Sequence, residues 1–438
     1  MKIVAHYIIC QMSEILDRKL EPVFKVIDKI EIVKADKKTL SNGISVYAIN
    51  AGEHELVKVD IIFDAGEWMQ KMPMLSYSVV SMLCEGSLFH TAEEIAEKFD
   101  FLGSYIYYNT QKHTATITIY SLQKHLEETL QLIEEIIKYP LFPEKEFETF
   151  NNKRKQQYTI DSQKVELIAQ KHFCRALFGN EHPYGMYPEL DDFDKITTMN
   201  IRSFHAQYFI AENCKIIIAG KIDESHIQLL NRYFGDIDWQ KLFVQPILDH
   251  KITSSVQKQI IVEKKDAVQS AIRIGKITIN KFDPDFPKLQ IVNTILGGYF
   301  GSRLMSNIRE DKGYTYGIGS GLVSYKNAGY FVIASEVGKN VTIDAIKEVY
   351  LEIEKLQTEL VSENELEVVR NYMLGNVLRN FDGPFALSDT LKTILEYDLG
   401  YEYFETFVET LKSITPNQIK SIAVKHLEKS SLYEIIAG

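Results

Sequence analysis

The chain has 438 residues, 45% of them hydrophobic and 25% charged, which is typical of a soluble globular protein with two or three domains. The formal net charge of −11 and the lack of a Lys/Arg stripe argue against a nucleic-acid partner, because phosphate binding needs clustered cations. No apolar run approaches the roughly 18 residues of a membrane span, and no signal-peptide cleavage site follows the N-terminus, so we expect a cytoplasmic protein without a membrane partner.

The first predicted elements are a strand and three helices. Residues 57–66 alternate or run apolar, as in a buried strand, and residues 75–104 predict a helix, a turn with Gly86 and a second helix. A long amphipathic helix is predicted over 126–137, because four of its apolar residues have helical spacing. These residues are Leu126, Leu130, Ile133 and Ile137.

The second half of the chain repeats the first. Residues 196–220 match 414–438 at an offset of 218, including the closing IIAG, and 141–157 parallel 360–376 at an offset of 219. Since an internal repeat indicates a repeated structural unit, we predict an α+β fold of two homologous repeats. Each repeat is predicted to run as a strand, two helices, a strand, a long helix, two more helices and a final strand. The expected parts are an N-terminal extension over 1–36, a first repeat over 37–238, a linker over 239–258 and a second repeat over 259–438.

Several segments resemble the pitrilysin/insulinase family of zinc peptidases, which includes the mitochondrial processing peptidases. MLCEGS (82–87) and AEEIAEKFDFLGS (92–104) fit the turn and second helix that follow the family's H-x-x-E-H helix. ALFGNEHPYG (176–185) resembles the family's YG-x-HP-x-G stretch. The resemblance covers nearly the whole chain from about residue 37. It implies a LuxS/mitochondrial processing peptidase-like metallohydrolase fold, with an antiparallel-rich sheet and helices packed on one side in each repeat.

The residues at the family's metal-binding positions are not zinc ligands in this chain. Two His and one Glu at i, i+3 and i+4 share a helix face and can hold Zn²⁺ and activate its water. Here the matching residues are Tyr77, Val80 and Ser81. Val has no ligand atom, and Ser is a poor neutral ligand for Zn²⁺. The family's distal Glu falls at Gln156 or Gln157, so we expect these positions to bind no metal and this chain to carry no cofactor.

A second pattern imitates ligand spacing just after this helix. His90, Glu93 and Glu94 stand at i, i+3 and i+4. However, Thr91 has the character of an N-cap, and acidic residues in a first helical turn complement the helix dipole. We therefore interpret this group as a helix cap and predict no metal there.

The segment SNIREDKGYTYG (306–317) resembles the family segment in which an Arg and a Tyr, seven positions apart, point at the substrate. The matching residues are Arg309 and Tyr316. A guanidinium and a phenol aimed at a substrate carbonyl would stabilise the negative charge that develops there. We expect Arg309 at a helix end, Tyr316 on a strand and a turn at Gly313 that can be left-handed. The alternative is that Arg309 pairs with a nearby acid while Tyr316 packs in the core.

The resemblance therefore implies a non-metal subunit of a heteromeric zinc peptidase, which is inactive alone. Its expected partner is a homologous subunit with H-x-x-E-H, which carries the zinc, and its expected substrate is a peptide. The alternative is a non-catalytic scaffold or a peptide-binding protein derived from a peptidase fold. The loop GGYFGS (297–302) has two interpretations, the lining of a cavity or a tight turn between helices.

Overall fold

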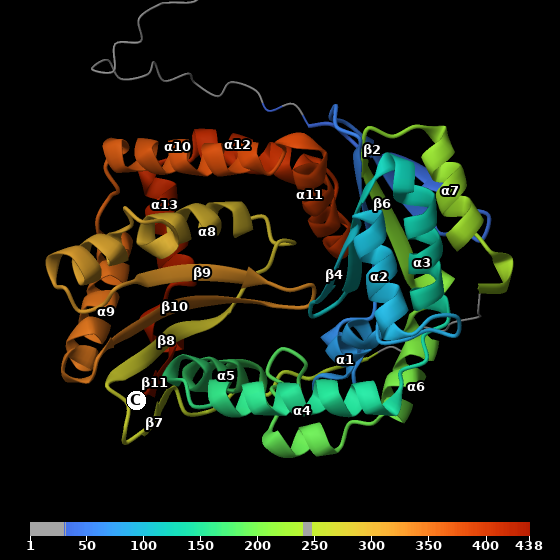
Figure 1. The fold of residues 1–438 in the computed structure, drawn as a ribbon. Helices are drawn as coiled ribbons and strands as arrows, with labels where there is room; N and C mark the ends of the chain where they lie inside the picture. The colour runs from blue at the N-terminus through green and yellow to red at the C-terminus, as the bar shows by residue number, and fades with distance from the viewer. Residues whose placement is uncertain (1–29, 31, 240–247) are drawn as a thin grey trace, which may run out of the picture. The chain divides into compact units, whose positions relative to one another are not determined.

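Two β-sheets carry the fold in the computed structural model, which describes residues 30, 32–239 and 248–438 (Figure 1). The strands of the first sheet are β1 (Asp36–Thr39), β2 (Ser45–Asn50), β3 (Leu56–Phe63), β4 (Tyr105–Thr110), β5 (Ala115–Leu122) and β6 (Cys214–Gly220). The strands of the second sheet are β7 (Gln259–Val262), β8 (Gln269–Thr278), β9 (Ile318–Ser324), β10 (Gly329–Gly338) and β11 (Tyr433–Ala437). Residues 33–438 form one compact unit.

The two sheets have the same topology. The strand order is β1-β2-β6-β3-β5-β4 in the first and β7-β11-β8-β10-β9 in the second, so they correspond strand for strand once β1 is set aside. One pair in each sheet is parallel, β2 with β6 and β7 with β11, and the other pairs are antiparallel. The predicted α+β fold with antiparallel-rich sheets is confirmed.

The helices follow the same repeat. In the first half they are α1 (Leu75–Met82), α2 (Ala92–Leu102), α3 (Leu126–Lys138), α4 (Glu144–Asp161), α5 (Val165–Phe178), α6 (Thr198–Tyr208) and α7 (Glu224–Phe234). In the second half they are α8 (Phe286–Asn293), the π-helical η6 (Thr294–Gly298) and η7 (Met305–Asp311), α9 (Thr342–Thr358), α10 (Glu363–Arg379), α11 (Gly383–Tyr397), α12 (Glu402–Ser413) and α13 (Pro416–His426). Both α6 and α13 begin with a Thr capping box, at Thr197 and Thr415, which are 218 residues apart.

The predicted series of elements within each repeat left out several strands and helices. Three strands precede the helix pair in the first repeat and two in the second, and two strands rather than one separate this pair from the long helix. More than two helices follow the long helix. The expected extension over 1–36 and linker over 239–258 lie partly outside the described residues, so the domain boundaries stay a proposal.

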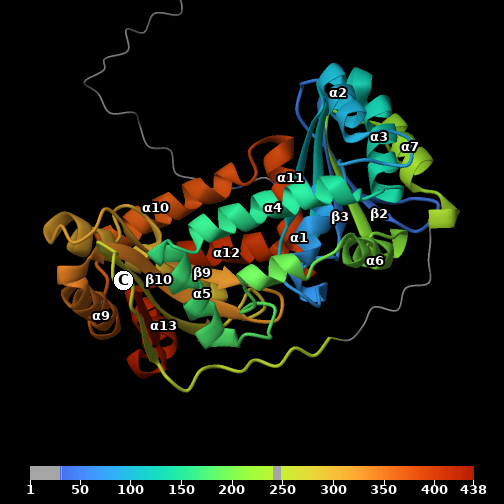
Figure 2. The same ribbon diagram turned by 60° about the horizontal axis from the view of Figure 1, so that its bottom comes forward.

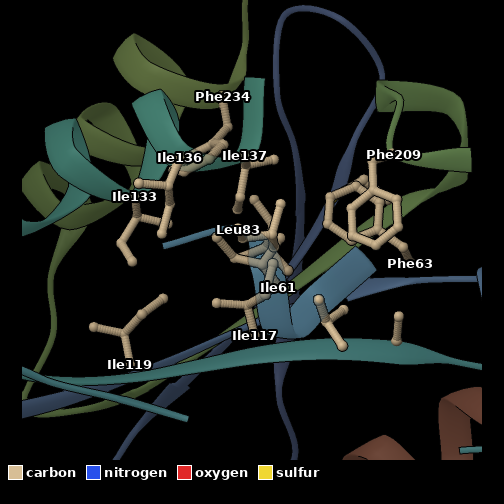
Figure 3. Close-up of a cluster of buried hydrophobic side chains, with 14 of the residues drawn as sticks. Ile61, Phe63, Leu83, Ile117, Ile119, Ile133, Ile136, Ile137, Phe209 and Phe234 are labelled. Atoms are coloured by element: carbon tan, nitrogen blue, oxygen red, sulfur yellow. The ribbon is translucent and has the colours of Figure 1, made fainter. Parts of the chain in front are cut away.

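The main core of the first repeat lies between its sheet and its own helices (Figure 3). The predicted apolar face of α3 is buried there, with Leu126, Leu130, Ile133 and Ile137 at most 1% exposed. In β3, Ile61 and its alternate neighbours join the same core. Because side chains alternate along a strand, the residues between them face the opposite side of the sheet.

That opposite side receives a helix from the other repeat. Helix α11 of the second repeat contacts β2 and β6 of the first sheet, and α5 of the first repeat contacts β8 and β11 of the second. These two helices occupy equivalent positions in the repeats, so each sheet is covered partly by the other repeat's helix. Lys58 and Asp60 of β3 meet α11 there, through Asp389 and Lys392. Within the described residues, no helix combines the length and apolarity that a membrane crossing requires.

Candidate functional site

Helix α1 carries the three residues that stand at the expected ligand positions. Its start is fixed because the backbone N–H of Ser76 donates to the side-chain oxygen of Gln70, at 3.2 Å. Val80 is 1% exposed and packs in the core, while Tyr77 is 40% exposed. Ser81 is half-buried. An apolar group inside the core cannot bind a metal, so α1 offers none of the expected chemistry.

The distal positions do not supply an anion either. Gln156 and Gln157 are exposed on α4, and the amide of Gln157 donates to Asp161 at 3.0 Å. Across the described residues, no three His, Cys, Asp or Glu side chains are grouped so that they could hold a metal ion. Cys84, just after α1, accepts a hydrogen bond from the Tyr108 hydroxyl. Burial raises the pKa of the Cys84 thiol to about 11, so it stays protonated at neutral pH and is no thiolate ligand.

An arginine occupies the space beside Tyr77. The guanidinium carbon of Arg154 lies 4.0 Å from the centre of the Tyr77 ring. Phe150, one turn earlier in α4, stacks on the same ring at 6.3 Å and an interplanar angle of 19°. Figure 2 shows α4 running past α1. The sequence interpretation did not single out Arg154, although this residue lies in the same helix as the expected distal ligand.

The second ligand-like group is a helix cap, as predicted. Thr91 accepts from the backbone N–H of Glu94, and the Glu94 carboxylate accepts from the backbone N–H of Thr91. The hydrogen bonds that the Glu94 carboxylate accepts from the backbone N–H and the hydroxyl of Thr91 lower the pKa of Glu94. His90 is held by Glu135 of α3, with its Nδ1 at 2.8 Å from a carboxylate oxygen. The capping box therefore explains this pattern without a metal.

The segment around Arg309 is a π-helical turn followed by a left-handed glycine. Arg309 lies near the end of η7, and Gly313 has a φ of +66°, as expected. Tyr316 does not lie on a strand, because β9 begins only at Ile318. This prediction was wrong by two residues, since Thr315 instead bonds back to the Glu336 carbonyl of β10 at 2.6 Å. The loop 297–302 is a tight connection, closed by a hydrogen bond from Ser302 to the Tyr299 carbonyl.

Arg309 is held by an aromatic ring. Its guanidinium carbon lies 4.6 Å from the centre of the Phe300 ring, and Phe300 is 63% exposed. Of the nine arginines in the described part of the chain, seven make hydrogen bonds to protein groups. Within that part, Arg309 and Arg154 are the two whose guanidinium has no hydrogen bond or ion pair, so the alternative in which Arg309 pairs with an acid is wrong.

Tyr316 is 94% exposed, which contradicts the alternative in which it packs in the core. It lines a cavity of about 370 Å³ together with Glu166, Arg273 and Glu336. Burial lowers the pKa of Arg273, whose guanidinium donates to Gln170 at 3.3 Å. Arg309 is not part of this lining, and among the described contacts no hydrogen bond joins it to Tyr316. The structure thus presents two separate donor groups on either side of the Gly313 turn.

Comparison with known proteins finds several that are similar to this chain. A family model described as the peptidase M16 inactive domain matches residues 195–373. An uncharacterized zinc protease, YmxG of Bacillus subtilis, is 23% identical over 78% of this chain and 84% of its own. A probable inactive metalloprotease, YmfF of the same organism, is 23% identical over 57% of each chain. The crystal structure of a peptidase M16 inactive domain from Pseudomonas fluorescens has a TM-score of 0.84, with 23% identity over 92% of this chain and 98% of that one.

The fold and these relatives agree with the resemblance found in the sequence. The sequence contains no H-x-x-E-H motif, and one relative carries a name that marks it as inactive. The chain is therefore similar to the M16 peptidases, the pitrilysin/insulinase group, and it lacks their zinc-binding motif.

Proposed function

We propose that this chain is the metal-free subunit of a heteromeric zinc peptidase and that Arg309 and Tyr316 hold the peptide substrate. A homologous partner with H-x-x-E-H would supply zinc, which polarises the scissile carbonyl and activates water when it is bound. The chain is inactive by itself in this proposal. The cytoplasm remains the expected compartment.

One observation carries the proposal. Among the described residues, the Arg309 guanidinium makes no hydrogen bond or ion pair to a protein group. A guanidinium presents five hydrogen-bond donors, and Arg309 is half-buried, so a ligand that reaches this surface can use them. The contact with the Phe300 ring positions the group without using any donor. Arg309 is thus oriented and available to bind a carbonyl or carboxylate oxygen.

Tyr316 supplies a second hydrogen-bond donor, a phenol hydroxyl rather than a guanidinium. Its phenol hydroxyl can donate a hydrogen bond, and the residue is 94% exposed, so it has room to meet a peptide or another subunit. The backbone on both sides is held, because Thr315 bonds to β10 and the Gly317 carbonyl accepts from the Ser335 hydroxyl at 3.0 Å. A fixed phenol can donate to a substrate carbonyl oxygen as negative charge develops on it.

A sheet edge is available for the peptide backbone. β4 ends the first sheet and pairs only with β5 among the described strands. Its outward residues Tyr105 and Tyr107 are 63% and 52% exposed. An extended peptide could add to such an edge through main-chain hydrogen bonds, with side-chain pockets giving selectivity. A cavity beside β4 includes Tyr105, Tyr107 and Tyr120 in its lining.

The test is reconstitution with a homologue from the same genome that carries H-x-x-E-H. The pair is expected to form a complex that cleaves a pool of internally quenched peptides, with activity lost on chelation. In that complex, Arg309→Ala and Tyr316→Phe should each lower kcat by roughly 10²-fold, the scale of losing one oxyanion donor. Size-exclusion chromatography of each variant complex separates loss of assembly from loss of turnover.

Two matched variants serve as controls. Tyr314→Phe removes a neighbouring phenol, and Arg379→Ala removes an exposed guanidinium that bonds Asn376 on the surface of α10. Both should leave kcat within about twofold of the unmodified complex. If Arg309→Ala and Tyr316→Phe also leave turnover unchanged in an intact complex, the chain is a scaffold or a peptide-binding protein.

A further inference from the structure

Arg154 forms a second site of free hydrogen-bond donors, separate from Arg309. It lies on α4 in the first repeat, whereas Arg309 lies on η7 in the second. Its guanidinium carbon is 4.0 Å from the centre of the Tyr77 ring, at stacking distance. The ring is itself stacked against Phe150, so the Tyr77 side chain is held from two sides. Arg154 is therefore positioned by packing rather than by a charge partner.

The hydrogen-bond donors of Arg154 have no protein acceptor among the described residues. Within residues 32–239 and 248–438, no hydrogen bond or ion pair to this guanidinium occurs, although neighbouring cations are paired. Lys155, the next residue, bonds the carboxylate of Asp194 at 2.6 Å. Tyr77 is 40% exposed and Arg154 is half-buried, so the pair can be reached from solvent. Partial burial strengthens the attraction of a guanidinium for an anion.

The shape and charge of the Arg154 guanidinium indicate which kind of ligand it binds. The guanidinium fork matches the two oxygens of a carboxylate, which it binds through two parallel hydrogen bonds. A single guanidinium also matches the single charge of a carboxylate. The aromatic stack leaves the edge of the guanidinium open, because the ring covers only its face.

We infer that Arg154, stacked on Tyr77, is a binding site for a peptide carboxylate. The site occupies the helix face where an active relative would carry its metal ligands, and it places a fixed positive charge there without a metal. The carboxylate is either the C-terminus of a peptide or an Asp or Glu side chain. The inference does not depend on a partner subunit, since both residues belong to this chain.

NMR on the complete chain alone can test this site. Selective ¹⁵N-arginine labelling gives side-chain Nε–H signals from the ten arginines, and Arg154→Lys assigns one of them by its loss. Three probes are titrated: N-acetyl-tetraalanine as the free acid, the same peptide as its C-terminal amide, and the amide with one alanine replaced by aspartate. The Arg154 signal should move with at least one carboxylate probe and stay in place with the uncharged amide. The two acids distinguish the C-terminal from the side-chain source.

Substitutions at the two positions measure separately how the aromatic contact and the positive charge contribute to binding. Arg154→Gln should weaken binding of the preferred acid by roughly tenfold or more, the scale of losing charge-assisted hydrogen bonds. Tyr77→Leu, which removes the stack and keeps the charge, should weaken it less, and Tyr77→Phe should leave it unchanged. Arg379→Gln, on an exposed arginine of α10, is the matched control and should have no effect.

Two results would overturn the inference. One is an Arg154 signal that no carboxylate probe shifts more than the uncharged amide does. The other is a shift confined to Arg309, which would leave the proposed function intact while removing this site. A failure of the reconstituted peptidase, in contrast, would leave the Arg154 result unaffected.

Discussion

The buried carboxylate of Asp60 should be one of the most sensitive positions in the chain. Asp60 is 0% exposed and joins β3 of the first repeat to α11 of the second. Its oxygens accept from Thr118 of the neighbouring strand and from Ser388. Lys392 donates to it at 3.0 Å, and the Lys58 ammonium lies 3.5 Å away. The substitution Asp60→Asn keeps the shape of the side chain but removes the negative charge and one acceptor.

The expected cost follows from what the substitution leaves unpaired. Breaking a buried ion pair by removing one partner costs about 3 to 5 kcal/mol, because the other charge stays buried. Lys58 and Lys392 also bond Asp389, at 2.6 and 2.7 Å, and Asp389 is 58% exposed. This second partner limits the loss, so we expect about 3 kcal/mol. Over 438 residues, an unfolding entropy of about 2.1 cal/mol/K per residue converts this loss to a Tm decrease of roughly 3 °C.

Differential scanning calorimetry of the purified chain measures this decrease. Asp266→Asn is the matched control, because Asp266 is exposed and, in the described structure, its carboxylate makes no hydrogen bond. The control should melt within about 0.5 °C of the unmodified chain. Lys392→Met combined with Asp60→Asn should cost less than the sum of the two single changes, since the residues share one network. A Tm for Asp60→Asn equal to that of the control would refute the assignment of this carboxylate as a link between the repeats.

Two further predictions concern the stability of the chain at low pH and the effect of a substitution at the Gly313 turn. Burial lowers the pKa of both His113 and His182 to about 4, below their value of about 6.5 in the unfolded chain. The unfolded chain therefore binds more protons below pH 6.5, and stability present at neutral pH is lost as pH falls toward 4, by up to about 3 kcal/mol per histidine. Urea midpoints at pH 7.5 and 4.5 measure this loss, and a double substitution to Gln should flatten it. Gly313→Ala should cost about 1 kcal/mol through backbone strain alone, since no atom lies within 4 Å of the added Cβ, whereas Gly317→Ala, without a positive φ, should be near neutral in the same thermal assay.

The repeat and the long helices could be predicted because their signals are local or internal to the sequence. The apolar spacing over 126–137 is sufficient to define α3, and the shared IIAG endings mark equivalent inner strands of the two sheets, β6 and β11. The hairpin of β4 and β5 was missed for a physical reason. Its turn, QKHT over 111–114, contains no Gly, Pro, Asn or Asp, so nothing in its composition marks a reversal of the chain. Its register comes instead from tertiary contacts, including the hydrogen bond between His113 and the Tyr184 hydroxyl at 2.7 Å.

The candidate site also has features that the sequence predicts and features that only tertiary contacts determine. The loss of ligand atoms at Tyr77, Val80 and Ser81 follows from residue identity alone, because no geometry turns Val into a ligand. The stacking of Arg154 on Tyr77 could not be predicted, since the residues are far apart in sequence and meet only where α4 passes α1. The position of Phe300 against Arg309 likewise depends on the tight connection over 297–302.

The small stabilisation free energy of the Arg154–Tyr77 contact helps to decide between a structural and a ligand-binding role for Arg154. Zinc held by two helices is both a cross-link and a reagent, and a structural zinc can stabilise a fold by 10 kcal/mol or more. A partly exposed cation–π contact contributes only about 0.5 to 1 kcal/mol, so it is far too weak to replace such a cross-link. Helix α1 does not need one, because Val79, Val80 and Met82 are each at most 1% exposed and anchor it in the core. Helix α1 is therefore held in place without Arg154, so the stability of the fold does not explain an unpaired, partly buried guanidinium beside it. The free donors of Arg154 support ligand binding as the explanation.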